Sequence, residues 1–366
     1  MKTTFIKILS LFLALAIMLC AFASCEKKNT KLAMQYKNSD GKVTGEIDQK
    51  LMSLIVAVVN FQLGTDALED NMWDMAYQEG NDTTVKQIVM AQSTAYAKGL
   101  LQAEYLCDKV YNIGLSDKQQ DSIDKYISDA SALFGSKKEF ENTLSVYGAD
   151  AAALERYIAL VLKQDTLFES LYAENGLRRN EIEQRKPQYF SEHYVICDHI
   201  LLKYSAGIKD DGTTIPISEE EKSQKREKAK TLYNEITNGV RDFDEALGEF
   251  NEDTYKLGYP FGYFVPDSFY WSGISQKVQD AALEMQVSEI RFVDTEDGAY
   301  IIRKNEMNPA LYASNGDFET YIDANLSQED FLSVCDSADG IIVNNDVINE
   351  LNPSTIPSFN IDTIGQ

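Results

Sequence analysis

YVICDHILLK, at residues 194–203, opens the most informative part of this chain, and GAYIIRK, at 298–304, closes it. The first block is an apolar run with a single histidine, His199, and is expected to form one strand. Between the two lie, in order, a charged helical pattern (218–239), FDEALGEFNED (243–253), GYPFGYF (258–264), VQDAALEM (278–285) and SEIRFVDT (288–295). Seven blocks in this order, within about 110 residues, are far more specific than any one of them.

The blocks resemble those of parvulin-type peptidyl-prolyl cis/trans isomerases. That family has a strand ending in His-Ile-Leu, helices with an F-x-x-x-A-x-x-x-S-x-D stretch, G-G-x-L-G-x-F, a short helix, and a strand pair closing on G-x-H-I-I. The resemblance implies an α+β fold over residues 192–308. This is the parvulin, FKBP-like domain, with a small antiparallel sheet and surrounding helices.

Such an enzyme needs neither a nucleophile nor a cofactor. Rotation of an X-Pro bond crosses a barrier of about 20 kcal/mol because it breaks amide resonance. The protein lowers that barrier with an apolar socket for the proline ring, exclusion of water and polar groups that favour the twisted amide.

The resemblance assigns roles to particular side chains. His199 matches the first-strand histidine, Asp253 the acidic or cysteine position facing the peptide carbonyl, and Thr295 the threonine of the histidine hydrogen-bond network. The remaining catalytic position falls on Tyr300. The substrate-binding positions and their neighbours are Cys197, Phe261, Phe269, Trp271 and Val278.

Two of these positions depart from the family pattern. Tyr300 replaces the second histidine of G-x-H-I-I, although its hydroxyl can still donate and accept a hydrogen bond. Val278 replaces a phenylalanine and so removes an aromatic wall from the socket. An insertion containing Phe269 and Trp271 lies close in sequence and offers an aromatic ring for the gap, or simply packs its own loop.

The cysteines indicate no further chemistry. Apart from Cys20 and Cys25, the cysteines are Cys107, Cys197 and Cys335, with no C-x-x-C, so neither a disulfide framework nor a metal site is expected. Cys197 and His199 share one face of the expected strand, but no orienting third group is visible, so core packing is the preferred interpretation.

The N-terminal residues 1–24 combine two lysines, no acid and an apolar core, which is typical of a secretory signal. Phe22-Ala23-Ser24-Cys25 then resembles a bacterial lipobox, which implies lipidation of Cys25 and anchoring of the mature chain to the extracytoplasmic face of the cell membrane. Cys20 lacks the small residues before it that the signal peptidase needs. An ordinary signal with a chance cysteine is the alternative.

The charge of the chain restricts its partners. The formal net charge is −24 at pH 7, and removal of residues 1–24 makes it −26. This charge opposes binding to nucleic acid or anionic headgroups, so we expect membrane contact through the lipid anchor alone.

The rest of the chain suggests a second folding unit. Residues 25–45 are polar and are expected to form a tether, and apolar stripes of helical spacing run through 46–191. A lipobox, a helical region, a parvulin domain and a C-terminal segment (309–366) together resemble foldases of the PrsA and SurA type. That resemblance implies an all-α chaperone domain, completed by the C-terminal segment, into which the isomerase is inserted.

Three functions stay open at this point. The first is a weak but active isomerase and foldase for unfolded or partly folded exported polypeptides that contain X-Pro bonds. The second is a holdase chaperone with a catalytically weak or inactive parvulin domain. The third is a solute-binding lipoprotein, which would need alternating strands and helices that the sequence lacks.

Overall fold

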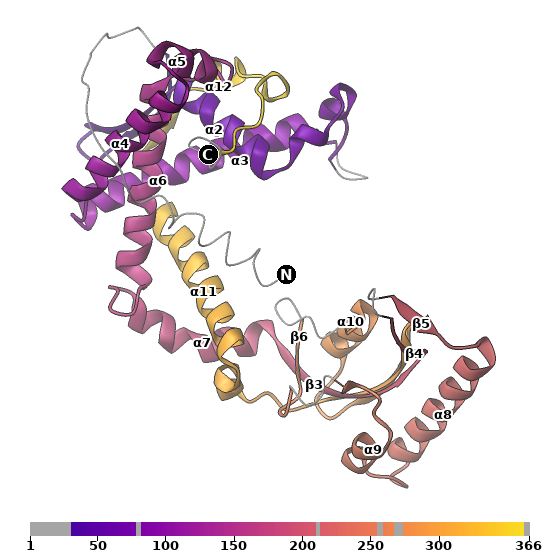
Figure 1. Cartoon of the computed structure of the whole chain (residues 1–366). Helices are drawn as coiled ribbons and strands as arrows, with labels where there is room; N and C mark the ends of the chain where they lie inside the picture. Colours follow the sequence, from indigo (N-terminus) through magenta and orange to yellow (C-terminus); the bar gives the residue numbers. More distant parts are fainter. Residues whose placement is uncertain (1–30, 78–81, 210–212, 255–258, 267–273, 362–366) are drawn as a thin grey trace. The chain divides into compact units, whose positions relative to one another are not determined.

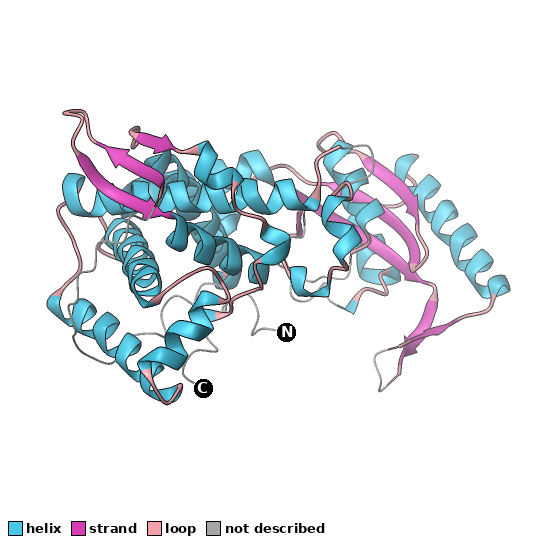
Figure 2. Ribbon diagram, turned by 90° about the horizontal axis from the view of Figure 1, so that it is seen from above, coloured by secondary structure: helices cyan, strands magenta, loops and turns pink. Residues whose placement is uncertain are grey.

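The computed structural model describes residues 31–77, 82–209, 213–254, 259–266 and 274–361. The chain divides into two compact units, one of residues 1–179 and 329–366 and the other of residues 180–328. The fold is α+β and mostly helical, and its described strands form three small antiparallel sheets (Figure 2). In that part of the chain, no helix is long and apolar enough to cross a membrane.

The first unit contains a three-stranded sheet in the order β2–β1–β9. Its strands are β1 (Leu32–Lys37), β2 (Val43–Asp48) and β9 (Ile341–Val343). The sheet therefore joins the start of the described chain to a segment about 300 residues later. The resemblance had implied an all-α domain here, and the sheet shows that this unit is not all-α.

The expected tether at 25–45 is wrong from Leu32 onward. Ala33, Met34 and Tyr36 of β1 are fully or almost fully buried, which gives the strand an apolar face. The residues that suggested an irregular tether form the hairpin turn instead. The N–H of Gly41 donates to the carbonyl of Asn38 at 2.8 Å, and Gly41 has a φ of 74°, a left-handed conformation that favours glycine.

Six α-helices lie wholly within the described residues of this unit, and the last of them is short (Figure 1). They are α2 (Gln49–Gln62), α3 (Val85–Tyr105), α4 (Asp117–Leu133), α5 (Lys137–Ser145), α6 (Ala151–Tyr172) and α12 (Asn345–Asn349). Helix α4 begins with a capping box: Ser116 accepts from the N–H of Gln119, whose side chain accepts from the N–H of Ser116. On α2, the buried Asn60 amide donates to the carbonyls of Pro353 (3.0 Å) and Ile356 (2.7 Å), which holds the C-terminal segment to this helix.

The second unit is built on a four-stranded antiparallel sheet in the order β6–β3–β8–β7. These strands are β6 (Tyr263–Val265), β3 (Val195–Lys203), β8 (Gly298–Lys304) and β7 (Ile290–Asp294). A separate hairpin pairs β4 (Ser205–Ile208) with β5 (Thr214–Pro216). The central strand β3 is buried on both faces because helices cover the sheet from each side.

Each face of this sheet has its own apolar cluster. Helices α8 (Glu219–Thr237) and α9 (Phe243–Phe250) pack over Ile200, Leu202 and Ile301. Helix α10 (Gln276–Glu284) packs over Cys197, Leu201 and Ile302 on the opposite face. His199 lies two residues from both Cys197 and Leu201 along β3. Side chains two residues apart on a strand point to the same face, so that of His199 lies on the α10 face.

A third cluster ties flanking helices to the sheet. Helix α7 (Arg179–His193) contributes Phe190, and α11 (Gly316–Asp336) contributes Phe318 and Ile322. These side chains pack against Tyr194, Ile196 and Phe264 at the start of β3 and on β6. The apolar core of this unit therefore extends beyond residues 192–308.

Candidate functional site

His199 lies near the middle of β3, directly opposite Ile302 of β8, and its side chain is 1% exposed. Its Nε2 lies 2.9 Å from Oδ2 of Asp253, whose side chain is 5% exposed. The donor and acceptor roles in this contact depend on the tautomer of the imidazole. His199 Nδ1 is also buried and has no hydrogen-bond partner among the described residues.

The loop after α9 holds Asp253 against β3. The side-chain oxygen of Asn251 accepts from the N–H of Leu201 (2.9 Å) and from the N–H of Asp253 (3.2 Å). The N–H of Glu252 donates to the carbonyl of Leu201 at 2.8 Å. These bonds fix the loop, so the carboxylate is positioned beside His199 before any ligand arrives.

Tyr263 of β6 completes this centre, and the sequence analysis did not identify it. Its hydroxyl donates a hydrogen bond to Oδ2 of Asp253, and its ring stacks on the imidazole of His199. Burial, together with the neighbouring Asp253 carboxylate, raises the pKa of Tyr263 well above its ordinary value. The hydroxyl therefore stays protonated and remains a donor at physiological pH.

A sequence signal for Tyr263 did exist. Tyr263 lies opposite Cys197 in the β3–β6 pair, and Cys197 is two residues from His199 along β3. The residue before Tyr263, Gly262, has a φ of 98°. A Cβ at Gly262 would lie 2.9 Å from Ile196 Cγ2, so glycine lets β6 approach β3 closely. The Gly-Tyr pair in GYPFGYF therefore places an aromatic hydroxyl beside the histidine.

Tyr300 contacts the same imidazole from another side. It lies opposite Leu201 on β8, and its ring meets His199 edge to face, with centroids 5.2 Å apart and planes at 68°. Its hydroxyl donates to Oδ2 of Asp297 at 3.1 Å. Burial, with Asp297 as the next cause, raises the pKa of Tyr300 well above its ordinary value.

Thr295 does not bond to His199, contrary to the family pattern. Its hydroxyl lies 2.7 Å from Oδ1 of Asp297 and 2.9 Å from the carbonyl of Gly298, within the β7–β8 turn. Asp297 therefore links Thr295 to Tyr300, and Thr295 reaches the histidine only through the edge contact of Tyr300. The side-chain hydrogen-bond partner of Thr295 is therefore Asp297 and not the imidazole of His199, which the family pattern had suggested.

The expected proline socket is only partly visible. Val278 is fully buried in the α10 cluster, and Cys197 is fully buried there too, so neither lines an exposed surface. Phe261 is 52% exposed. Phe269 and Trp271 lie outside the described residues, as does Cys25.

The site therefore combines one imidazole, one carboxylate and two phenols inside an apolar cluster. Across the described ranges, no group of three or more His, Cys, Asp or Glu side chains is arranged to hold a metal ion. The fold holds these polar groups in place and shields them from water, because each of the four side chains is at most about 5% exposed.

Comparisons with known proteins give a distant structural likeness. No protein family matches the sequence, and no curated protein matches it. Among solved structures, PrsA from Bacillus subtilis matches with 15% identity and a TM-score of 0.24, over 76% of this chain and 92% of that chain. The peptidylprolyl isomerase PrsA from Bacillus anthracis matches with 19% identity and a TM-score of 0.23, over 64% and 92%.

The foldase protein PrsA from Streptococcus pneumoniae is similar in the same degree. It has 16% identity and a TM-score of 0.23, over 75% of this chain and 96% of that chain. TM-scores this low carry no functional argument, so any function proposed for this chain rests on the site itself.

Proposed function

We propose that this chain is a membrane-anchored extracytoplasmic foldase whose second unit catalyses cis/trans isomerisation of X-Pro bonds in exported polypeptides. The carrying observation is the buried contact between His199 and Asp253, with the phenol of Tyr263 donating to the same carboxylate. It stands within the ordered parvulin-like motifs of residues 194–304.

The chemistry follows from what a twisted amide needs. As the X-Pro bond rotates, resonance is lost and the carbonyl carbon becomes more electrophilic, so a nearby carboxylate such as Asp253 favours the twisted form. His199 and Tyr263 hold that carboxylate in place through hydrogen bonds. Apolar surroundings exclude water and strengthen each of these interactions.

A holdase without turnover is the second candidate, and two observations favour it. Val278 is part of the packed α10 cluster and does not form a socket wall. Asp253 is 5% exposed and is already held by two side chains, so a substrate can reach it only if the surrounding cluster opens. Both features predict a slow enzyme.

A protease-coupled assay on a proline-containing peptide tests the proposal with the mature chain. A missing aromatic contact of about 1–3 kcal/mol corresponds to a rate roughly 10- to 100-fold below that of a complete socket. We expect weak activity, best with an apolar or basic residue before proline because the chain is acidic. No metal or nucleotide should be needed.

Matched variants make the assay specific. Asp253→Ala should lower the catalysed rate about tenfold or more because it removes the carboxylate beside His199. Asp280→Ala removes one exposed carboxylate of α10 in the same unit and should leave the rate unchanged. A wild-type rate equal to the uncatalysed rate, with aggregation of an unfolded client still suppressed, would favour the holdase.

A further inference from the structure

The sheet of the first unit has an unpaired edge. In the order β2–β1–β9, strand β9 has β1 on one side, and no described strand pairs with its other side. The N–H of Lys37 donates to the carbonyl of Gly340 (2.9 Å), and the N–H of Asn344 donates to the carbonyl of Ala33 (2.8 Å). Backbone direction alternates along a strand, so the N–H and C=O groups of Ile341 and Val343 face away from β1.

This edge lacks several usual safeguards against further pairing. Exposed edge strands are commonly blunted by lysine, proline or a bulge, whereas β9 is Ile341-Ile342-Val343, and its register with β1 is regular. Ile342 is 47% exposed on a strand with no polar side chain. Its short length is the remaining safeguard, so any bound strand needs side-chain contacts as well.

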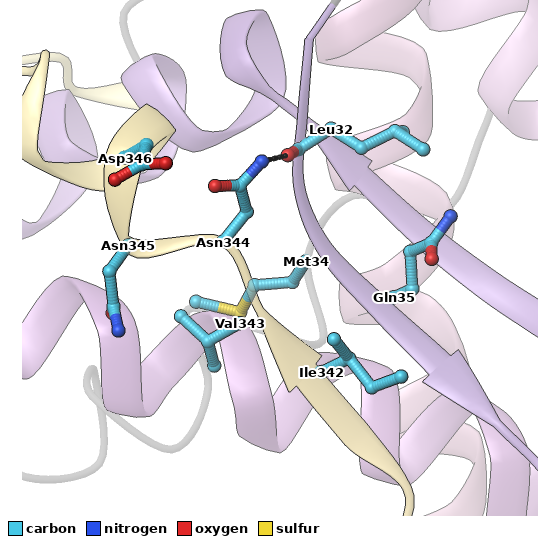
Figure 3. Close-up of a pocket in the computed structure, with 8 residues that line it drawn as sticks. All are labelled: Leu32, Met34, Gln35, Ile342, Val343, Asn344, Asn345 and Asp346. Carbon is cyan, nitrogen blue, oxygen red and sulfur yellow. Dashed lines mark hydrogen bonds between the residues drawn. The ribbon is translucent and has the colours of Figure 1, made fainter.

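A pocket of about 620 Å³ beside the edge can supply these contacts (Figure 3). The side-chain amide of Asn344 donates to the carbonyl of Leu32 at 3.1 Å, which fixes the end of β9 against β1. Asp346 is the one charged residue of the lining. The lining residues are Leu32, Met34, Gln35, Ile342, Val343, Asn344, Asn345 and Asp346.

We propose that the free edge of β9 and this pocket bind an extended polypeptide segment with alternating apolar and basic side chains. Backbone bonds to Ile341 and Val343 would add the segment as a fourth strand, the mode by which open sheet edges capture peptides. Alternate side chains of that segment point to one face. Apolar ones contact Ile342, and a basic one pairs with Asp346 in a chain whose net charge is −24.

This binding goes beyond the proposed isomerisation because it requires no proline and uses the other unit of the chain. The test is fluorescence anisotropy on the mature chain, with a labelled, proline-free peptide of alternating valine and lysine. A second peptide has the same side chains but a methylated backbone nitrogen at every residue, which removes the N–H donors of both of its edges. The first peptide should bind, and the methylated one should bind at least about tenfold more weakly.

Protein variants give an independent test. Val343→Pro removes the outward N–H and leaves the β1-facing bonds of Ile342 and Asn344 in place, whereas Val343→Thr keeps the N–H. Val343→Pro should weaken binding about tenfold, Val343→Thr should not, and Asp346→Asn should weaken binding mainly at low salt. Circular dichroism checks that each variant is folded.

Several outcomes would overturn the proposal. Equal binding of the two peptides by the unmodified chain would exclude strand addition, even if Val343→Pro fails to fold. Absence of peptide binding, together with dimerisation that Val343→Pro abolishes, would assign the edge to a second copy of the chain. Because the peptide contains no proline, neither result depends on isomerase activity.

Discussion

The imidazole of His199 and the phenol ring of Tyr263 are stacked, with centroids 4.6 Å apart and planes within 17° of each other. Both side chains also bond to the same oxygen of Asp253. The stack and the shared carboxylate make one rigid group, in which neither ring can turn without breaking a buried hydrogen bond. Tyr263 is therefore as central to the proposed site as His199 and Asp253, which the sequence motifs identified.

Tyr263→Phe tests this relationship directly. It keeps the stacked ring but removes a hydrogen bond to a carboxylate, so the free energy of unfolding should fall by about 1.5–3 kcal/mol. Isomerase activity should fall as well, because Asp253 loses one of the groups that orient it. Chemical denaturation and the coupled assay measure the two effects.

Tyr233→Phe is the control, because this tyrosine packs on Phe292 in the other cluster, and its hydroxyl has no partner among described residues. Equal effects of the two changes would contradict the role of Tyr263.

Val278→Phe should not restore a faster enzyme. From the family pattern alone, this change would raise the rate by rebuilding an aromatic wall, but Val278 is fully buried in a packed cluster. Overpacking such a site typically costs about 1–3 kcal/mol, so we expect a lower melting temperature and no gain in rate. Val240→Phe places the same ring at a valine that is 77% exposed and should leave both measurements unchanged. A faster and equally stable Val278→Phe enzyme would show that the cluster opens to substrate.

Local signals predicted several elements because their causes are local. Ser116 and Gln119 form a reciprocal cap that requires only four adjacent residues, and helix α4 begins where this pair predicts. Strand β1 pairs mainly with β2, and the polar residues of the turn between them suggested a tether instead of a hairpin. Only the pairing of β1 with β9, about 300 residues away, leaves no local pattern.

The site residues divide in the same way, into those that the sequence motifs identify and those that depend on the folded structure. Ordered motifs identified His199 and Asp253, and the structure brings their side chains within hydrogen-bond distance. Tyr263 and Asp297 were missed because their roles depend on strand register and on a turn, which decide where a hydroxyl or carboxylate points. Thr295 was assigned to the wrong partner for that reason: its hydroxyl bonds within the turn.

Anchoring depends on a residue outside the described part of the chain. If Cys25 is lipidated, its acyl chains hold the protein at the membrane, since each buried methylene contributes about 0.8 kcal/mol. Cys25→Ala should therefore move the protein from the membrane fraction to the soluble fraction of lysed cells. Cys20→Ala is the matched control and should leave the distribution unchanged. Equal membrane association of the Cys25→Ala protein would refute the lipobox interpretation.

Fragments of the chain should separate the two units, with boundaries wider than the motifs suggest. A fragment of residues 192–308 lacks Phe190, Phe318 and Ile322, which leaves Tyr194 and Phe264 uncovered. We expect residues 180–328 to melt cooperatively and several degrees higher than 192–308. Phe318→Ala in the longer fragment should remove about 3–5 kcal/mol of its stability. Equal melting of the two fragments would mean that α7 and α11 contribute little to this core.

Removal of the C-terminal segment should affect the first unit selectively. Deleting residues 337–366 removes β9 and the carbonyls of Pro353 and Ile356 that pair with the buried Asn60 amide. A buried donor without a partner costs about 1–3 kcal/mol, and the loss of β9 exposes the backbone of β1 that had paired with it. The melting transition of the first unit should therefore fall. Isomerase activity measures the second unit and should not change.

Asp165 on α6 should make the stability of the first unit depend on pH. Burial, followed by the nearby Glu169, raises the pKa of Asp165 from 3.8 to about 7, and its Oδ2 has no hydrogen-bond partner among the described residues. The folded chain therefore binds this proton between about pH 4 and pH 7 while the unfolded chain does not, so stability falls as the pH rises through this range. Asp165→Asn should remove that slope and raise stability at about pH 8 by roughly 1–2 kcal/mol, a figure reduced for partial exposure. Melting curves at about pH 5 and pH 8 measure the effect, and Asp121→Asn, at an exposed aspartate of α4, is the control. If the two variants had the same pH slope, Asp165 would have to be ionised in the folded chain throughout this range.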